Sequence, residues 1–382
     1  MPGNLHRKAA GLLSDVTGRI TRVAFALPGE EPDVVPPLAD CMGSVLRALG
    51  RGTRALVLHH PEQQAAADAL ARAHTVESLR WTRPRTLRFQ PGRMQFGDDG
   101  VLRLGPTPIG DYTPWIQDTC LVRRTPQGPG LLANPDVVRP AGGLDTDVPA
   151  LLARHLGWPL EPLPVPVDAA NVLVNQDHVV IGRDALTGRH PEARAVLDLL
   201  APEGTRALLV PATGPQPVRH LDMVLAPAGR CGPDQRPTMV VASPALATQV
   251  TGAKADVPAS RAEGLDRLAD DLAAAGYDVV RVPGTRRRAR PEWKPGWLSW
   301  TNVLVEHWQE DGVERRRVIL PAYGTDGGPA AKDLDAAAAE SWRGLGFAVD
   351  WAEGPFTWMA TFDAGVRCLT KVLARGETER GR

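Results

Sequence analysis

Short, mostly apolar runs recur along the chain, and alanine-rich stretches with apolar residues at helical spacing separate several of them. The apolar runs begin at Val23, Arg54, Asn171, Val179, Thr238, Val279, Asn302 and Val318. The alanine-rich stretches begin at Pro61, Ser260 and Ala330. This alternation of strands with helices predicts a mixed α/β fold.

Two of the helical stretches lead into a strand in the same way. The segments AAAGYDVVRVPG from Ala273 and WRGLGFAVDWAEG from Trp342 both place a glycine and an aromatic residue between helix and strand. Repeats of a strand-strand-helix-strand unit suggest a radial array, because ringed units bury faces that one unit leaves exposed. We expect the Pro/Gly-rich segments 124–145 and 285–297 to form loops over one face.

The composition is that of a folded protein, since 43% of the 382 residues are hydrophobic and 23% are charged. The length suits either two ordinary domains or one large symmetric domain. Lys+Arg and Asp+Glu both number 44, so no overall charge attracts nucleic acid or a membrane surface. The first twenty residues lack a signal-peptide core, and no segment offers the ~18 apolar residues of a membrane span. We expect a cytoplasmic protein without nucleic-acid or membrane partners, and the oligomeric state stays open.

Four cysteines stand singly at positions 41, 120, 231 and 368, without the close pairs of a zinc site or the density of a disulfide scaffold. We therefore expect reduced thiols. Cys368, in GVRCLTKVL from Gly365, follows a glycine-containing turn and precedes an apolar run. Taken alone, the segment favours a buried structural thiol, since free cysteine is often buried, with a nucleophile as the alternative.

A second segment, RHLDMVL from Arg219, combines a histidine with a carboxylate. His220 and Asp222 alternate with apolar residues, and on a strand they would share one face. The segment therefore predicts either a pair directed into a cleft or two ordinary polar residues on a half-exposed strand.

A third segment, DYTPWIQDTCLV from Asp111, carries Trp115, Gln117 and Asp118 just before an apolar run. Trp115 and Gln117 again have strand spacing. Taken alone, the segment favours a tryptophan that anchors a loop, with Asp118 as a turn residue.

Taken together and in this order, the three segments resemble the motifs of the guanidine-modifying enzymes of the pentein superfamily. The likeness is greatest to the peptidylarginine deiminases, and it includes the agmatine and arginine deiminases. It rests on Trp115–Asp118, on His220 with Asp222, on Cys368 with Thr370, and on the two NVLV segments from Asn171 and Asn302. It extends from about Pro106 to Arg375.

The resemblance implies a pentein fold, a five-bladed pseudo-symmetric α/β propeller of ββαβ units around one central site. We accordingly expect a single catalytic domain over residues 21–376. A poorly ordered N-terminal tail of residues 1–20 would precede it, and a C-terminal tail of residues 377–382 would follow.

The resemblance also assigns a catalytic role to Cys368, His220, Asp222 and Asp118. Two carboxylates, Asp118 and Asp222, would each hold N–H groups of a planar guanidinium by charge-assisted hydrogen bonds. Cys368 would attack its carbon as a thiolate, and His220 would transfer protons to ammonia and from water. Hydrolysis of the covalent thiouronium would convert arginine to citrulline, whereas attack by an amine would make the chain an amidinotransferase.

The choice of guanidine rests on finer features of the resemblance. Agmatine deiminases usually have arginine where this chain has Gln117, which favours arginine in a peptide or protein as substrate over free arginine, agmatine or methylarginine. Trp115, Gln117, Arg139 and Asn171 are the expected substrate-binding residues. Asp168-Ala169-Ala170-Asn171 replaces the Gly-Gly-Asn of the family, and the alanines would be strained if that turn needed positive φ.

No metal or other cofactor is expected. Animal peptidylarginine deiminases have calcium-binding acidic residues after the first motif, where this chain has Thr119 and Cys120. A zinc site at His220, Asp222 and Cys368 is disfavoured because closely spaced ligand pairs are missing. Two other classes remain as alternatives: a non-catalytic pentein binding protein, and a cysteine protease, which would not need two carboxylates around its substrate.

Overall fold

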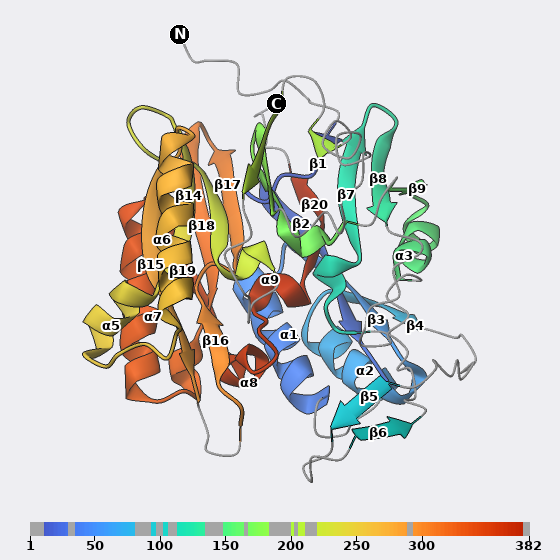
Figure 1. The fold of residues 1–382 in the computed structure, drawn as a ribbon. Coiled ribbons are helices and arrows are strands. Elements are labelled where there is room, and N and C mark those ends of the chain that lie inside the picture. Colours follow the sequence, from blue (N-terminus) through green and yellow to red (C-terminus); the bar gives the residue numbers. More distant parts are fainter. Residues whose placement is uncertain are drawn as a thin grey trace.

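The computed structural model describes residues 11–29, 35–80, 93–96, 102–105, 113–133, 148–163, 167–182, 200–201, 205–210, 220–288 and 293–376. In this part of the chain, five sheets of three or four strands are arranged around a centre (Figure 1), and β5 (Arg93–Phe96) and β6 (Leu102–Gly105) form a separate two-stranded sheet. None of the described helices combines the length and the hydrophobicity that crossing a membrane requires.

The five sheets, which we call blades, repeat one strand order. In each, the first strand is antiparallel to the second, and the third strand is parallel to the second. The first strands are β7 (Cys120–Thr125), β10 (Val172–Asn175), β13 (Leu225–Arg230), β17 (Leu304–Glu310) and β20 (Lys371–Gly376). The second strands are β8 (Gly128–Ala133), β11 (His178–Gly182), β14 (Pro237–Ser243), β18 (Val313–Pro321) and β2 (Arg19–Leu27). The third strands are β9 (Leu160–Pro162), β12 (Arg206–Val210), β15 (Asp278–Arg287), β19 (Ala348–Ala352) and β3 (Arg54–His59).

In four of the blades the described residues include helices between the second and third strands, as a parallel pair requires. They are α3 (Val148–Leu156), α5 (Pro244–Thr251), α6 (Ala259–Ala274), α7 (Pro329–Gly344) and α1 (Val35–Leu49). The remaining pieces are β1 (Gly11–Leu12), η1 (Pro61–Gln63), α2 (Gln64–Ala73), β4 (Val76–Arg80), β16 (Gly296–Ser299), η6 (Tyr323–Thr325) and α8 (Phe356–Ala360). These four blades thus show the ββαβ order that the resemblance implied.

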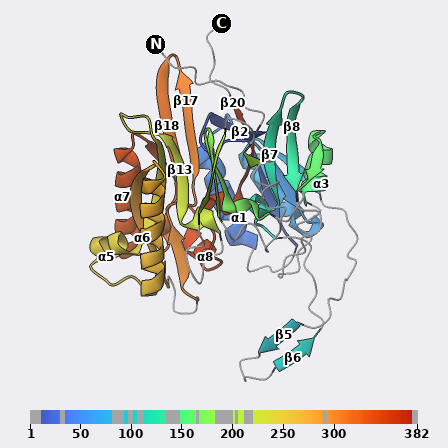
Figure 2. The same ribbon diagram turned by 45° about the horizontal axis from the view of Figure 1, so that its top comes forward.

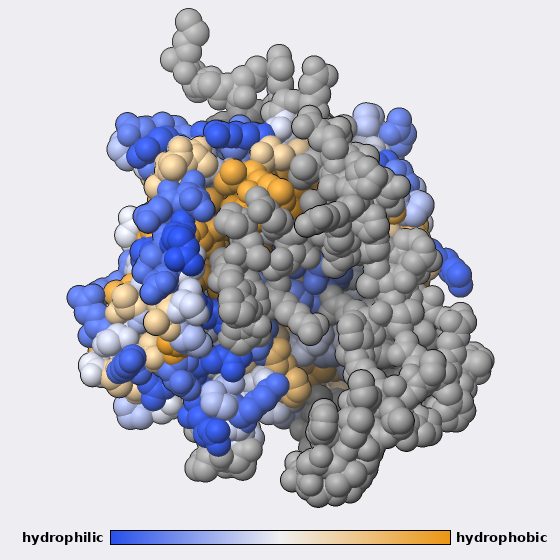
Figure 3. Space-filling view, in the orientation of Figure 1, coloured by the Kyte–Doolittle hydropathy of each residue, from blue (hydrophilic) through white to orange (hydrophobic). Residues whose placement is uncertain are grey.

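Amphipathic helices cover the outside of the blades. In α6, Leu265, Leu268 and Leu272 are buried at helical spacing, and its other face is exposed. Hydrophilic side chains gather over α6 in the space-filling view (Figure 3). Both predicted helix stops are glycines in the left-handed region, Gly276 at φ 91° and Gly346 at φ 83°.

Three expectations about loops and tails are corrected. Within 124–145 and 285–297, the described residues include all of β8, the first half of β16 and the ends of β7 and β15. Residues 11–20, expected in a disordered tail, contain β1 and pack into the fold, with Val16 fully buried. Each of these strands is paired with a neighbouring strand. The backbone hydrogen bonds of that pairing stabilise the extended conformation despite the Pro and Gly content.

The last blade joins the two ends of the described chain. Its first strand, β20, pairs antiparallel with β2, for example at Val372 and Val23. Figure 2 shows β20 and β2 side by side near the middle of the molecule. The ring of blades is therefore closed by strands far apart in the sequence.

Candidate active site

Each blade carries a short turn directly before its first strand, and the predicted catalytic residues lie in these turns. The turns are η2 (Ile116–Asp118), η3 (Ala169–Asn171), η5 (Leu221–Met223), residues 300–303 and α9 (Val366–Leu369). η3 packs against η2 and η5, and η2 packs against α9. Residues from distant segments therefore meet at one end of the ring, where the first strands begin.

The turn geometry corrects the strand spacing expected for two motifs. His220 precedes a 3₁₀ turn and Asp222 lies within it, while Trp115 precedes the turn that contains Gln117 and Asp118. The turn of His220 and Asp222 is fixed by a side chain from the preceding blade, which competes with a regular strand pairing. His220 and Asp222 still reach one place, because single atoms of His220, Asp222 and Cys368 lie within 4.8 Å of one another.

Cys368 is held by Asn302 of the preceding blade. The Asn302 side-chain oxygen accepts hydrogen bonds from the backbone N–H groups of Arg367 (2.8 Å) and Cys368 (3.1 Å). Its Nδ2 donates to the Cys368 sulfur at 3.1 Å. The thiol is 2% exposed, and Asp222 Oδ2 lies 4.0 Å from it. Asn302 therefore fixes both the turn and the sulfur.

His220 lies between two carboxylates. Its Nε2 is 3.1 Å from Asp168 Oδ2, and its Nδ1 is 3.9 Å from Asp118 Oδ1. Burial by itself lowers the pKa of His220, but Asp118 and Asp168 outweigh this effect and raise the pKa well above the ordinary 6.5. A hydrogen bond to Cys368 contributes in the same direction to the pKa. The imidazole is therefore set up to carry a proton next to the thiol.

Asp222 is fully buried and has two different oxygens. Oδ2 accepts a hydrogen bond from Arg367 Nη1 at 2.9 Å, while Oδ1 has no hydrogen-bond partner among the described residues. Burial raises the pKa of Asp222 to about 6, although the charges of Arg367 and His220 oppose it. A buried carboxylate oxygen without a partner is costly, so Oδ1 is suited to accept from a bound cation.

The charges around the thiol determine how readily it ionises. Burial, with a smaller contribution from the Asp222 charge, raises the pKa of Cys368 to about 11, and the hydrogen bond from His220 opposes the rise. A cation bound between Asp222 and Asp118 would offset their charges and lower the pKa of Cys368. The site thus favours the thiolate when a cation is present.

The expected substrate-binding residues lie in different places. Trp115 is half-buried, with its ring 6.1 Å from that of Phe362. Gln117 is buried within its turn, and its backbone oxygen accepts a hydrogen bond from Lys371 Nζ (3.2 Å). Asn171 is buried, and its side chain accepts a hydrogen bond from Leu221 N (2.7 Å). Arg139 lies outside the described residues.

Asp168, Asn302 and Arg367 are three site residues that the sequence reasoning did not select. Asp168 stands in the DAAN segment, and Asn302 repeats Asn171 in the NVLV pattern, so both carried a signal. Neither Ala169 nor Ala170 has positive φ, so the strain considered for DAAN is not present. For Arg367, the only signal in the sequence was its position next to Cys368.

Two sets of side chains could in principle hold a metal ion. They are His220 with Asp222 and Cys368, and His220 with Asp118 and Asp168. Thiolate, imidazole and carboxylate are ligands that zinc accepts. Both sets use His220, however. An ion held by the first set would bind the Cys368 sulfur, which would then not be available as a nucleophile. The arrangement therefore suits proton and thiol chemistry at least as well as metal binding.

Searches with protein-family models and against curated protein sequences give no match. Solved structures do match at low sequence identity. A protein provisionally named a peptidyl-arginine deiminase gives a TM-score of 0.66 at 12% identity, over 96% of this chain and 99% of that one. Agmatine deiminase from C. jejuni gives 0.63 at 10% identity, over 96% of both chains. A protein provisionally named an agmatine deiminase gives 0.66 at 13% identity, again over 96% of both. The five-bladed ring that the chain shares with these proteins confirms that it has the pentein fold.

Proposed function

We propose that this protein hydrolyses a guanidinium group to a urea group and ammonia through a covalent intermediate on Cys368. The observation that carries the proposal is a buried thiol next to an imidazole and two buried carboxylates, Asp118 and Asp222. A third carboxylate, Asp168, contacts the other side of His220. Two carboxylates suit a planar cation, whereas an acyl-transfer enzyme needs donors for an oxyanion.

In the first half of the reaction, the sulfur of Cys368 bonds to the guanidinium carbon. The tetrahedral adduct then breaks a C–N bond, and the departing nitrogen takes a proton from His220 and leaves as ammonia. The product is an S-alkylthiouronium on Cys368. Asp118 and Asp222 hold the remaining N–H groups throughout and keep the carbon in line with the sulfur.

In the second half, a water molecule gives a proton to His220 and its oxygen bonds to the same carbon. The C–S bond breaks with its electron pair on sulfur, which returns the thiolate, and the new hydroxyl gives its proton to solvent to leave a urea group. The net reaction converts the guanidinium and one water to a urea group and ammonium. Asp168 assists both halves because its charge favours the protonated imidazole.

For the substrate class we favour arginine within a peptide or protein. The support is the Trp115–Asp118 motif, which resembles that of peptidylarginine deiminases, and the similar fold of a protein provisionally named for that activity. Agmatine deiminases fit the fold about equally well, with TM-scores of 0.63 and 0.66. The Gln117 amide, oriented to satisfy both its atoms, contacts Arg367 and the Thr370 backbone oxygen, so we assign it a supporting role and leave substrate contact to Trp115, Asp118 and Asp222.

The proposed reaction needs no metal. The residues that follow the first motif are Thr119, whose hydroxyl donates to the backbone oxygen of Ile116, and Cys120. Neither is a ligand that calcium prefers, so we propose activity without calcium. A cytoplasmic location, and a peptide as the partner rather than nucleic acid or membrane, remain predictions from the sequence.

The test is turnover of arginine peptides, free arginine, methylarginine and agmatine by the purified protein, with and without calcium or a chelator. Ammonia release and conversion to the urea product, seen by mass spectrometry, are the measurements. The control is Cys368→Ala. Cysteine-dependent, calcium-independent conversion of peptides is the expected result.

A second measurement checks the site without knowledge of the substrate. The cation 2-chloroacetamidine and the neutral 2-chloroacetamide both alkylate thiols and differ mainly in charge. We expect Cys368 to react faster with the cation, because Asp118 and Asp222 hold it.

Turnover of agmatine alone would replace the peptide assignment, and transfer to an added amine would indicate an amidinotransferase. No turnover and no preference for the cation would overturn the proposal.

A further inference from the structure

The segment 11–18 contacts four of the five blades. It hydrogen-bonds to the first strands of three blades, at Val122, Val174 and His307. A fourth first strand, β20, contributes Arg375, whose guanidinium donates to the backbone oxygens of Asp15, Val16 and Gly18. The segment is therefore fixed at the centre of the fold.

Asp15 is the carboxylate that this segment places near the site. Its Oδ2 accepts a hydrogen bond from Val174 N at 2.8 Å, and its backbone N donates to Val174 O at 2.9 Å. Its Oδ1 accepts from Arg367 Nε (3.3 Å) and Nη2 (3.2 Å). Asp15 thus binds one edge of the Arg367 guanidinium while both of its own oxygens are held.

Arg367 also contacts Asp222, and so it connects Asp15 with Asp222. Its Nη1 donates to Asp222 Oδ2, and its Nη2 also donates to the backbone oxygen of Val172 (3.1 Å). With the Gln117 amide oriented to satisfy both its atoms, its oxygen accepts from Arg367 Nη2 at 3.0 Å. Arg367 is 5% exposed and directly precedes Cys368 in the chain. A buried guanidinium, the group that the proposed substrate presents, therefore already occupies one oxygen of Asp222.

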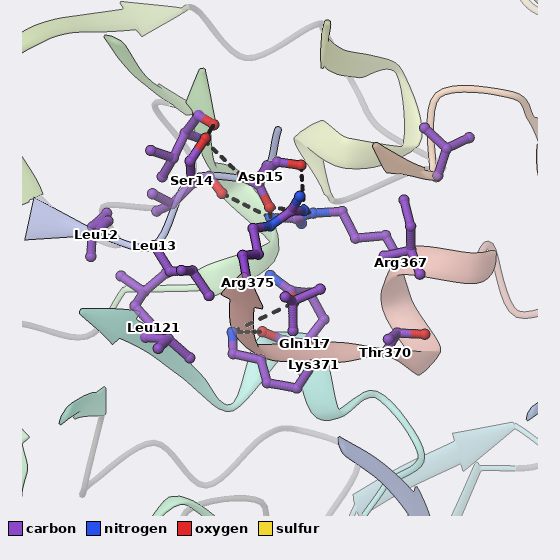
Figure 4. Close-up of a pocket in the computed structure, with 16 residues that line it drawn as sticks. Leu12, Leu13, Ser14, Asp15, Gln117, Leu121, Arg367, Thr370, Lys371 and Arg375 are labelled. Atoms are coloured by element: carbon purple, nitrogen blue, oxygen red, sulfur yellow. Dashed lines mark hydrogen bonds and ion pairs between the residues drawn. The ribbon is translucent and has the colours of Figure 1, made fainter. Parts of the chain in front are cut away.

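A small cavity lies beside this chain of contacts (Figure 4). Its volume is about 40 Å³, and Asp15, Gln117, Arg367, Lys371 and Arg375 are among the residues that line it. Such a volume has room for a few water molecules. The hydrogen bonds to Asp15 and Asp222 hold Arg367 beside it.

We propose that Asp15 and Arg367 are positioning residues that make Asp222 present Oδ1 alone to the substrate guanidinium. This inference rests on the proposed function. The groups that act on Asp222 are Arg367, His220, Asp118 and Cys368. Of the first three, Arg367 makes the largest contribution to lowering its pKa against burial, so losing that charge should raise the pKa of Asp222. Asp15 acts one step away, by keeping Arg367 in contact.

The experiment measures the rate of Cys368 alkylation by 2-chloroacetamidine and by 2-chloroacetamide from pH 5 to 9, in the full-length protein. For the wild type we expect the cation-to-neutral ratio to fall as the pH drops through about 6, where Asp222 takes up a proton. For Arg367→Gln we expect that fall at a pH about one unit higher, which lowers the ratio at pH 7 by about twofold. Arg367→Lys should restore part of the ratio, and Asp15→Asn should shift the fall in the same direction by less.

Arg375→Gln is the matched control. Arg375 is equally buried and holds the same segment, but its described contacts are backbone oxygens and not Asp222. This variant should lower the melting temperature without moving the pH at which the ratio falls. In turnover assays, Arg367→Gln should reduce kcat more than it changes KM. The loss of the guanidinium leaves the Asp222 carboxylate present but misplaced.

The inference is overturned if Arg367→Gln slows both reagents equally and leaves the pH dependence where it was. It is also overturned if Arg375→Gln moves that dependence as much as Arg367→Gln does. If Arg367→Gln does not fold, Arg367→Lys and Asp15→Asn decide the question. A wild type that does not prefer the cation contradicts the proposed function instead, and the neutral reagent then tests the inference, because Asp222 lies 4.0 Å from the sulfur and its protonation alters that rate as well.

Discussion

The turn that carries Cys368 and the turn that carries His220 and Asp222 are supported by the same device. In both, the asparagine of an Asn-Val-Leu-Val segment lies at the start of the preceding blade and accepts hydrogen bonds from backbone N–H groups of the turn. Asn171 accepts from Leu221 N, and Asn302 accepts from Arg367 N and Cys368 N. The repetition of the fold therefore places the His220 and Cys368 turns at equivalent points of two different blades.

The two turns differ in what the asparagine does beyond this support. Asn302 also donates to the Cys368 sulfur, whereas the charge of the His220 turn comes from carboxylates, Asp168 and Asp118. One asparagine thus has a structural and an electrostatic role, and its repeat has the structural role. Substitutions at matched positions can separate the two.

The largest difference is expected between Asn302→Asp and Asn171→Asp. Either aspartate keeps an oxygen for the backbone N–H groups, but at position 302 it replaces the donor at the sulfur with a negatively charged acceptor. The thiolate is then repelled, so kcat/KM should fall by roughly 10²–10³-fold. For Asn171→Asp we expect a fall of less than about tenfold. Equal losses in the two variants would end the distinction between the asparagines.

The alanine variants compare the structural roles alone. Asn302→Ala leaves two buried N–H groups without their acceptor and Asn171→Ala leaves one, at a cost of about 1–3 kcal/mol each. The free energy of unfolding from urea denaturation should therefore fall about twice as far for Asn302→Ala. A larger loss for Asn171→Ala would show that its turn depends on that bond more heavily.

Two glycines test how tightly each asparagine is enclosed. A Cβ at Gly365 would lie 2.8 Å from Asn302 Oδ1, whereas a Cβ at Gly182 would lie 3.2 Å from Asn171 Oδ1. Gly365→Ala must displace Asn302 and should cost about 1–3 kcal/mol of stability and reduce activity as well. Gly182→Ala should cost less and leave more activity, as thermal melts and kcat/KM can establish.

The smallest expected effect is that of the Asp168 carboxylate on His220, in the second of the two turns. Because the Asp168 charge raises the pKa of His220, Asp168→Asn should lower that pKa. The protonated imidazole is then lost at lower pH, so the alkaline limb of kcat/KM should move towards neutrality, with little change in acid. The pH–rate profile is the measurement, and an unchanged alkaline limb would show that another group sets it.

Much of the fold was open to prediction because each blade repeats one pattern of strand and helix. Apolar runs such as those from Arg54 and Val318 became strands, and the alanine-rich stretches became α2, α6 and α7. Apolar periodicity is a local property that burial preserves. The resemblance supplied the number of blades, which periodicity did not.

The turns of the site were harder to predict. The alternation at His220 and Asp222 suggested a strand, but the Asn171 side chain, about fifty positions earlier, takes up the Leu221 N–H at 2.7 Å. The contacts of Arg367 with Asp15 and Asp222 exist only after the ring has closed. Bonds between segments so distant leave no periodic signal in the sequence.

The pairing of β20 with β2 also bears on the order of events during synthesis. A ribosome adds roughly 5–20 residues per second, so β2 waits on the order of tens of seconds for its antiparallel neighbour. Cys368 lies directly before β20 and emerges with it. A nascent chain that ends before Cys368 has neither this thiol nor a completed ring, and Cys368 meets Asn302 and Asp222 only as the last blade is assembled.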